Sequence, residues 1–268
     1  MPASLDSILA ATRKRLSQRR ESCDWRALER AAAGHVPRGF RAQLRSVAQD
    51  GIAVIAELKK ASPSKGLIRA DFKPSELARD LDAAGAAALS VLTDEEFFQG
   101  SLEYLREASS HSSLPCLRKD FIIDEFQIVE ARASCADAIL LIVAALEQNE
   151  LISLAGIARS QGLDVLCEAH DEGELQRALD AGCDVIGINS RDLRTFEVNL
   201  ETALRLVEKM PKGCVRVAES GIQTGADLAR LRSAGYEAFL VGERLMKAND
   251  PAAALASLME EAKVLVSR

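Results

Sequence analysis

From residue 52 onward, the sequence repeats one unit: a short apolar run, a loop rich in Gly, Ser, Asp or Asn, and an amphipathic stretch. Apolar runs of about four to eight residues are typical of buried strands, and the longer amphipathic stretches are typical of helices. We predict strands at 52–59, 87–93, 115–119, 138–143, 164–169, 185–189, 215–220 and 238–242. We predict helices at 74–84, 101–108, 124–134, 147–161, 172–181, 200–209, 225–234 and 251–266.

Strands that alternate with helices pair in parallel through right-handed crossovers. Eight such units in about 220 residues predict an α/β fold, a (β/α)8 TIM barrel. An open doubly wound sheet is the alternative, but it usually carries G-x-G-x-x-G after its first strand, and that motif is missing here. Leu5, Ile8, Leu9, Thr12 and Leu16 share one helical face. We therefore expect one domain over 1–268, with a helical extension at 1–48 and the barrel at 49–268.

Composition excludes several classes of function. The net charge is −6 and aromatic residues make up 4%, whereas general nucleic-acid binders are basic and base-stacking surfaces are aromatic. Apolar runs such as 138–146 are shorter than the roughly 20 residues that span a bilayer. We expect no nucleic-acid and no membrane partner. Six cysteines without a C-x-x-C pair argue against a metal or redox motif and favour a reducing, cytoplasmic location.

Polar residues end five of the predicted strands on the face that points into a barrel. They are Glu57, Lys59, Lys119, Glu168, Asn189 and Glu219. A barrel interior is normally filled by branched apolar side chains, and isolated buried charges cost several kcal/mol each. One such residue alone would be a solvated strand end. Together, at the end of a barrel where active sites are built, they predict a catalytic site.

Two further segments suggest a phosphate site. Ser220 and Gly221 follow the seventh strand, and Gly242 and Glu243 end the eighth. The loops after these strands form the usual phosphate cradle of such barrels, and glycines let backbone N–H groups approach the oxygens. We expect the side chain of Glu243 to point away from a phosphate. Arg191 has inward parity and adds a positive charge, unless it forms a surface ion pair with Asp192.

The remaining candidates line a binding pocket. Ser62 lies in the polar loop 60–66, which is longer than a minimal turn. Phe97, Phe98 and Phe121 follow the second and third strands and are candidates for an apolar ring pocket, with burial against the barrel helices as the alternative. Leu140 and Leu240 are further candidate substrate-binding residues. His170 follows Glu168 by two residues, and we expect a solvated loop histidine there.

The chain resembles the indole-3-glycerol-phosphate synthase family. The segments that carry the resemblance are IAVIAELKKASPSKG (52–66), SVLTDEEFFQGS (90–101), PCLRKDFIIDEFQIVEAR (115–132), DAILLIVAAL (137–146), INSRDLRTFEVNL (188–200), VAESGI (217–222) and LVGERLM (240–246). They span nearly all of residues 50–250 in family order. The chain departs from the family at Ser190, where Asn is frequent, at Cys135, where Gly is frequent, and at Cys167, where an apolar residue is usual.

The resemblance implies the same barrel and a specific reaction. The substrate would be 1-(2-carboxyphenylamino)-1-deoxyribulose 5-phosphate, an anthranilate-derived sugar phosphate, which closes a ring and loses carbon dioxide and water. Lys119 resembles the general acid, while Glu57, Lys59 and Glu168 suit acid–base work. Asn189 and Glu219 would orient the substrate. No metal and no organic cofactor are implied, and other enzymes of tryptophan biosynthesis are candidate partners.

Three other functions stay open on the residues alone. A Schiff-base aldolase also uses a lysine at a barrel strand end, here Lys59 or Lys119. An isomerase acting on phosphoribosylanthranilate is a second candidate, although its family uses a Cys and an Asp, where this first strand ends Glu-Leu-Lys. A non-catalytic phosphosugar-binding barrel is the third, and it would not need this many charged strand ends.

Overall fold

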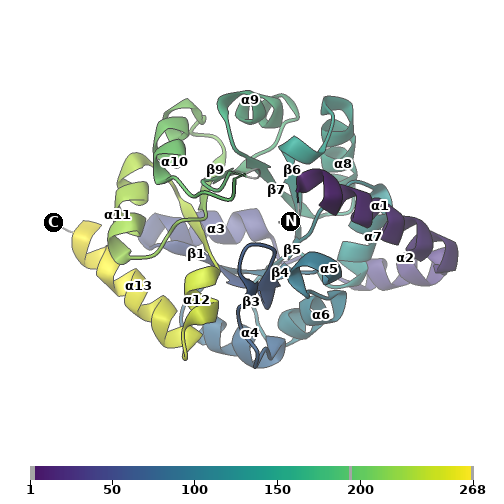
Figure 1. Ribbon diagram of the computed structural model, residues 1–268, viewed down its shortest axis with the longest axis horizontal. Coiled ribbons are helices and arrows are strands. Elements are labelled where there is room, and N and C mark those ends of the chain that lie inside the picture. The colour runs from purple at the N-terminus through teal and green to yellow at the C-terminus, as the bar shows by residue number, and fades with distance from the viewer. Residues whose placement is uncertain (1–3, 193–194, 267–268) are drawn as a thin grey trace.

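The computed structural model of the chain describes residues 4–192 and 195–266. Residues 1–3 of the expected N-terminal extension, residues 193 and 194 of the motif at 188–200, and residues 267 and 268 lie outside the described residues. Within the described ranges, eight parallel strands close into a barrel surrounded by helices (Figure 1). The strands are β1 (Ala53–Leu58), β4 (Ala88–Leu92), β5 (Cys116–Lys119), β6 (Ala138–Ile142), β7 (Asp164–Ala169), β8 (Val185–Asn189), β9 (Val215–Glu219) and β10 (Ala238–Val241).

Each strand pairs with the next in the chain, and β1 closes the circle by pairing with both β4 and β10. The (β/α)8 TIM barrel predicted from the sequence is therefore confirmed, and no strand boundary differs from the prediction by more than one residue. The fourth predicted strand ends one residue early because Val143 begins a 3-10 turn, Val143–Ala145.

Helices cover the outside of the barrel and begin at recognisable caps. They are α4 (Pro74–Ala83), α6 (Leu102–Ser110), α7 (Glu125–Ala133), α8 (Gln148–Ser160), α9 (Glu172–Asp180), α10 (Leu200–Leu206), α11 (Gly225–Ala234) and α13 (Pro251–Val266). Pro74 opens α4, where its missing N–H needs no partner. The side chain of Asp171 accepts from the Glu174 amide at the start of α9, and Thr224 forms a capping box with Asp227 at α11.

The barrel interior is apolar from its N-terminal end to its middle. Inward residues such as Ile55, Leu117 and Val217 are fully buried in one cluster. Helix α3 (Phe40–Asp50) closes the bottom, since Phe40 and Leu44 belong to the same cluster and are fully buried. The interior therefore becomes polar at the C-terminal ends of the strands alone, which places a site at the top.

The N-terminal extension contains three helices, α1 (Leu5–Ser22), α2 (Trp25–Gly34) and α3, where the apolar pattern had indicated a helix at its start. Figure 1 shows α1 and α2 together at one side of the barrel, beside α7. The fully buried Asp137 anchors the link between α2 and α3. It accepts from Arg38 Nε at 3.0 Å and Nη2 at 2.7 Å, and from the Cys116 amide at 2.6 Å, and lies 3.1 Å from His35 Nε2.

Three arginines of α1 pair with acids at the other end of the barrel, where β4 and β5 end. Arg15 pairs with the buried Asp94, Arg19 pairs with Glu95 at 3.1 Å, and Arg20 Nη1 lies 2.8 Å from Asp124 Oδ2. These ion pairs fix α1 at the rim of the barrel. None of the helices in the described part of the chain combines the length and the apolar character that a bilayer crossing requires.

Candidate active site

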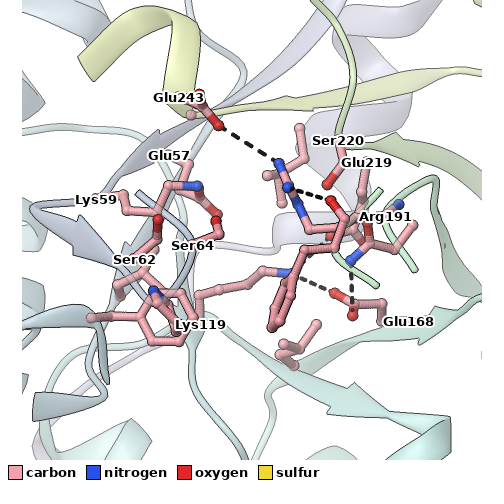
Figure 2. A pocket seen from close by; sticks show the side chains of 18 of the residues that line it. Glu57, Lys59, Ser62, Ser64, Lys119, Glu168, Arg191, Glu219, Ser220 and Glu243 are labelled. Carbon is pink, nitrogen blue, oxygen red and sulfur yellow. Dashed lines mark hydrogen bonds and ion pairs between the residues drawn. The ribbon is translucent and has the colours of Figure 1, made fainter. Parts of the chain in front are cut away.

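One pocket opens at the C-terminal ends of the barrel strands, and every candidate residue proposed from the sequence except Phe97 lines it. The candidate catalytic side chains there are Glu57, Lys59, Lys119, Glu168, Asn189 and Glu219. The candidate binding residues are Ser62, Phe98, Phe121, Leu140, Arg191, Ser220, Gly221, Leu240, Gly242 and Glu243. Figure 2 shows the charged ones converging from different strands. The inward parity of strand residues explains this convergence.

Lys119 lies at the centre of the charged groups (Figure 2). Its Nζ lies 2.6 Å from Glu168 Oε2 and 2.8 Å from Glu219 Oε2. All three side chains are nearly buried, with 11% of Lys119 exposed. Burial acts to lower the pKa of Lys119, but Glu168 and Glu219 outweigh it and raise that pKa above its ordinary value. The lysine is therefore an ammonium group that donates to two acceptors.

The two carboxylates that bracket Lys119 differ in their surroundings. Glu168 Oε1 also accepts from Asn189 Nδ2 at 3.1 Å and lies 3.4 Å from His170 Nε2. Burial acts to raise the pKa of Glu168, but Lys119 and His170 outweigh it and hold that pKa well below its ordinary value. Glu168 is thus an ionised carboxylate near neutral pH.

Glu219 has fewer partners than Glu168. Its Oε1 is buried and accepts no hydrogen bond from any described residue. Burial raises the pKa of Glu219 to about 7, with Lys119 opposing the rise and Glu168 adding to it. Gly187 makes room for this side chain, since a Cβ there would overlap Glu219 Oε1 and lie 3.1 Å from its Cδ. Glu168 and Glu219 thus contact the same lysine, and their pKa values are shifted in opposite directions. Such a pair is suited to acid–base chemistry.

Glu57 and Lys59 form a second charged pair on the opposite wall. Lys59 Nζ lies 2.5 Å from Glu57 Oε1, and Glu57 is almost fully buried. Gly242 lies directly against Glu57, because a Cβ at Gly242 would lie 2.9 Å from the Glu57 Cβ and Cδ. From the sequence we expected Gly242 to let backbone N–H groups approach a phosphate. In the structure, a glycine is needed there because the Glu57 side chain occupies the space that a Cβ would take.

The turn after β9 has the backbone shape expected of an anion cradle. Ser220 and Gly221 have φ values of 64° and 82°, both in the left-handed region. Consecutive residues of this kind direct N–H groups toward one side of a turn. A Cβ on Gly221 would lie 2.7 Å from Val198 Cγ1 and 2.9 Å from Leu200 Cδ2, so a side chain would not fit there. This turn faces the pocket beside Arg191.

Glu243 differs from the expectation that its side chain points away. Its carboxylate lines the pocket, accepts from Lys247 Nζ at 2.6 Å and lies 3.6 Å from Arg191 Nη2 (Figure 2). It begins the short helix α12 (Glu243–Lys247), whose N-terminus follows Gly242. Arg191 also donates to the Phe196 carbonyl at 3.1 Å. The arginine is therefore tethered on two sides rather than free in solvent.

An apolar wall faces the charged groups. The rings of Phe98 and Phe121 lie 6.3 Å apart between centroids, and Leu140 and Leu240 close the floor. Phe97, proposed with Phe98, is not among the described residues that line this pocket. The expectation that it joins them is wrong, because it lies in the short helix α5 (Glu95–Phe98), where the neighbouring side chain points inward instead.

Several pocket residues were missed by the sequence reasoning. They are Leu5, Ile8, Leu92 and Phe196, among others, whereas Pro63 and Ser64 lie in the loop 60–66 that the sequence had already indicated. Leu5 and Ile8 carried a signal, the apolar face of α1, but that pattern does not tell where a helix docks. Ser64 lies between two short strands, β2 (Ala61–Ser62) and β3 (Gly66–Leu67), that pair as a small hairpin within the loop after β1.

His170 is not the solvated loop histidine that we expected. Its side chain is 13% exposed, and its Nδ1 lies 2.9 Å from Glu174 Oε2. The expectation is wrong because Glu174, in the first turn of α9, folds back over the histidine. Burial acts to lower the pKa of His170, but Glu168 and Glu174 raise it to about 10.

The donor set of this pocket is that of an acid–base site. Among residues 4–192 and 195–266, no group of three or more His, Cys, Asp or Glu side chains has the arrangement of a metal site. The six cysteines are free, and Cys116, Cys167, Cys183 and Cys214 are buried as the apolar runs predicted.

Known proteins resemble this chain over nearly its full length. The family model described as indole-3-glycerol phosphate synthase matches residues 5–258. A protein of Koribacter versatilis (strain Ellin345) named indole-3-glycerol phosphate synthase is 57% identical over 97% of this chain and 100% of its own length. A protein of the same name from Polaromonas naphthalenivorans (strain CJ2) is 48% identical over 96% of this chain and 98% of its own.

Solved structures with low sequence identity share the fold alone. Thiamine phosphate pyrophosphorylase from Pyrococcus furiosus matches with a TM-score of 0.61 at 17% identity, over 80% of this chain and 97% of that one. A mandelate oxidase variant matches with a TM-score of 0.61 at 19% identity, over 81% of this chain and 73% of that one. By the family match and its close relatives, the chain belongs to the indole-3-glycerol phosphate synthase family.

Proposed function

We propose that this chain is an indole-3-glycerol phosphate synthase, a carboxy-lyase of tryptophan biosynthesis. Its substrate is 1-(2-carboxyphenylamino)-1-deoxyribulose 5-phosphate, and its products are indole-3-glycerol phosphate, carbon dioxide and water. The observation that carries the proposal is Lys119, held as an ammonium between Glu168 and Glu219 in a pocket with an apolar wall on one side and an anion-type turn on the other.

The first step is ring closure, for which Lys119 is the acid. The aromatic carbon that bears the carboxylate attacks the ketone carbon of the sugar chain, and the ketone oxygen takes a proton from the Lys119 ammonium. The C–C bond to the carboxylate then breaks, carbon dioxide leaves, and the electron pair returns to the ring and restores aromaticity. The apolar pair Phe98 and Phe121 would hold the aromatic ring for this attack.

The second step is dehydration, which needs an acid and a base. The new hydroxyl leaves as water after it takes a proton, and the neighbouring carbon gives up a proton to form the double bond of the indole. Glu168 is the base, because its low pKa keeps it ionised. Lys59 and Glu57, paired at 2.5 Å, are placed to supply the proton to the leaving hydroxyl.

The turn at Ser220 and Gly221 would bind the phosphate through its backbone N–H groups. Arg191 and Lys59 supply positive charge beside it. Glu243 offsets part of this charge, so we expect Arg191 to exchange its contact with Glu243 for the phosphate when substrate binds. The same pocket is lined by the Phe98–Phe121 pair and by this turn, which agrees with a substrate that carries both an aromatic ring and a phosphate.

A Schiff-base aldolase is the main alternative, and the site disfavours it. A lysine nucleophile must lose its proton before it attacks a carbonyl. Lys119 has a raised pKa between two carboxylates, and Lys59 is paired with Glu57. A non-catalytic phosphosugar-binding barrel would not need a buried ammonium and three carboxylates together, since each costs free energy to desolvate.

The test is incubation of the purified chain with the carboxyphenylamino substrate, with indole fluorescence and carbon dioxide release as readouts. We expect both products in equal amounts. Binding without turnover would contradict the proposal and favour the non-catalytic barrel. Covalent trapping of a keto-sugar phosphate on Lys59 or Lys119 by borohydride would instead favour the aldolase.

We further propose that residues 1–48 and 49–268 form one domain that unfolds as a unit. We also propose that the protein is located in the cytoplasm. The ion pairs of Arg38 with Asp137 and of Arg15 with Asp94 join the two parts, and six free cysteines suit a reducing compartment. A single cooperative unfolding transition followed by both Trp25 fluorescence and circular dichroism is the expected result. Two separate transitions would contradict the single-domain assignment.

A further inference from the structure

His170 lies directly behind the base Glu168, at the point where β7 passes into α9. Its Nε2 is buried, makes no hydrogen bond with any described residue, and lies 3.4 Å from Glu168 Oε1. The side chain of His170 is therefore aimed at a catalytic carboxylate without being fully engaged by it. Contacts of this kind in unliganded sites often tighten when substrate binds.

Glu174 fixes the imidazole from the opposite side. Its Oε2 accepts from the His170 backbone N–H at 2.8 Å and lies 2.9 Å from Nδ1. This double contact sets the orientation of the ring, because the main chain and the side chain of one residue are held by one carboxylate oxygen. The result is a line of three groups, Glu174, His170 and Glu168, that runs from α9 into the pocket.

The charges around His170 favour its protonated form. Glu168 and Glu174 are the titratable groups that face it, and Lys119 and Glu219 lie on the far side of Glu168. Both facing groups are acids, which agrees with the raised pKa of the imidazole. A positive charge behind Glu168 would keep this carboxylate ionised even while Lys119, its other cationic partner, gives its proton to the substrate.

We propose that His170, oriented by Glu174, is a positioning residue that holds Glu168 ionised and aimed at the substrate. The inference rests on the proposed function, in which Glu168 is the base. Asn189 Nδ2 donates to the same Oε1 at 3.1 Å, so this oxygen is restrained by two groups while Oε2 faces Lys119 at 2.6 Å. The histidine need not touch the substrate to act in this way.

Two substitutions separate positioning from a purely structural role. In His170→Asn the amide nitrogen can occupy the place of Nδ1, so the contact with Glu174 is kept and the one with Glu168 is lost. In His170→Gln the amide nitrogen can occupy the place of Nε2, so the reverse holds. Both variants are neutral, and their melting temperatures report whether the fold survives.

For His170→Asn we expect kcat to fall roughly 10- to 100-fold, the size of effect that a misplaced catalytic group produces, with KM within about twofold. The acidic limb of kcat/KM should move to higher pH by about one unit, because loss of the cation raises the pKa of Glu168. His170→Gln should keep more of kcat but show the same pH shift. Wild-type turnover and pH profile in His170→Asn, with losses confined to His170→Gln, would overturn the proposal.

A readout that does not depend on turnover keeps this inference separate from the proposed function. The chain has three histidines, so the imidazole nitrogens of His170 can be assigned by nuclear magnetic resonance with His170→Asn as reference. We expect a doubly protonated ring at pH 8 in the wild type and a lower pKa in Glu174→Gln. A neutral His170 ring at pH 8 would overturn the inference even if the enzyme is active, and an inactive enzyme with a charged His170 would contradict the proposed function alone.

Discussion

The bare backbone of Gly242 gives Glu57 the space that its side chain occupies. A Cβ on Gly242 would overlap Glu57 Oε1 and lie 2.9 Å from both Cβ and Cδ of the glutamate. Glu57 lies on β1 and Gly242 directly follows β10, and these two strands pair with Ala56 opposite Val241. The end of one strand thus determines where a charged side chain of the next can lie.

Gly242→Ala should therefore displace Glu57 and disturb its pairing with Lys59. We expect kcat to fall by about 100-fold, the cost of a displacement of about 1 Å at a catalytic group, while the fold is retained. The matched control is Gly156→Ala in α8, where a Cβ has open space; it should stabilise the exposed helix by about 1 kcal/mol and leave turnover unchanged. Equal kinetics for the two variants would contradict the role given to Gly242.

Lys119→Met leaves Glu168 and Glu219 buried without their shared cation. We expect a loss of about 3–5 kcal/mol in the free energy of unfolding at pH 8, because a buried charge that loses its partner is costly. Unpaired buried carboxylates have raised pKa values, so their protonated forms restore stability as the pH falls. Denaturant unfolding at pH 8 and pH 5 measures this difference, and Lys212→Met, at an exposed position, should show no change at either pH.

Glu219→Gln tests the raised pKa of this carboxyl group. A folded-state pKa of about 7 against an ordinary value of 4.5 means that stability is present below pH 4.5 and is lost as the pH rises toward 7. The variant lacks this loss, so its free energy of unfolding relative to wild type should increase between pH 4.5 and pH 7 and then level off. Glu208→Gln, at an exposed position, should give a flat difference. A flat difference for Glu219→Gln as well would refute the shift.

Ile8→Ala tests whether α1 is part of the binding site. Ile8 is 5% exposed and lines the pocket, and removing its methyl and methylene groups takes away apolar surface that the substrate ring would cover. We expect KM to rise about tenfold with kcat nearly unchanged. Ile152→Ala on the exposed face of α8 is the control. An unchanged KM would place α1 outside the binding site.

The barrel and its charged end could be predicted from the sequence because both depend on short-range periodicity. Alternation along a strand puts Glu57, Glu168 and Glu219 on the inward face whatever the helices do. The chain crossing from each strand to the next then brings these strand ends to one rim. The resemblance to a known family rests on the same strand-end residues, and it is the resemblance that predicted the reaction.

The features that could not be predicted from the sequence depend on contacts between distant or irregular segments. Arg15 meets Asp94 across 79 positions of the chain, so the docking of α1 over the pocket has no local pattern. His170 becomes buried because Glu174 turns back over it from the next helix. Glu243 points into the pocket because Lys247 and Arg191 hold it there. Each of these outcomes is decided by tertiary packing rather than by propensity.

The central claim is that the Lys119 ammonium between Glu168 and Glu219 protonates the substrate ketone during ring closure. The most direct measurement is a single-turnover reaction of the carboxyphenylamino substrate with wild type and with Lys119→Met, at a pH where both are folded, followed by indole fluorescence and by equilibrium binding. The account predicts product in the wild type, and in the variant substrate binding without ring closure. Product formed by Lys119→Met at a rate near that of the wild type would contradict it.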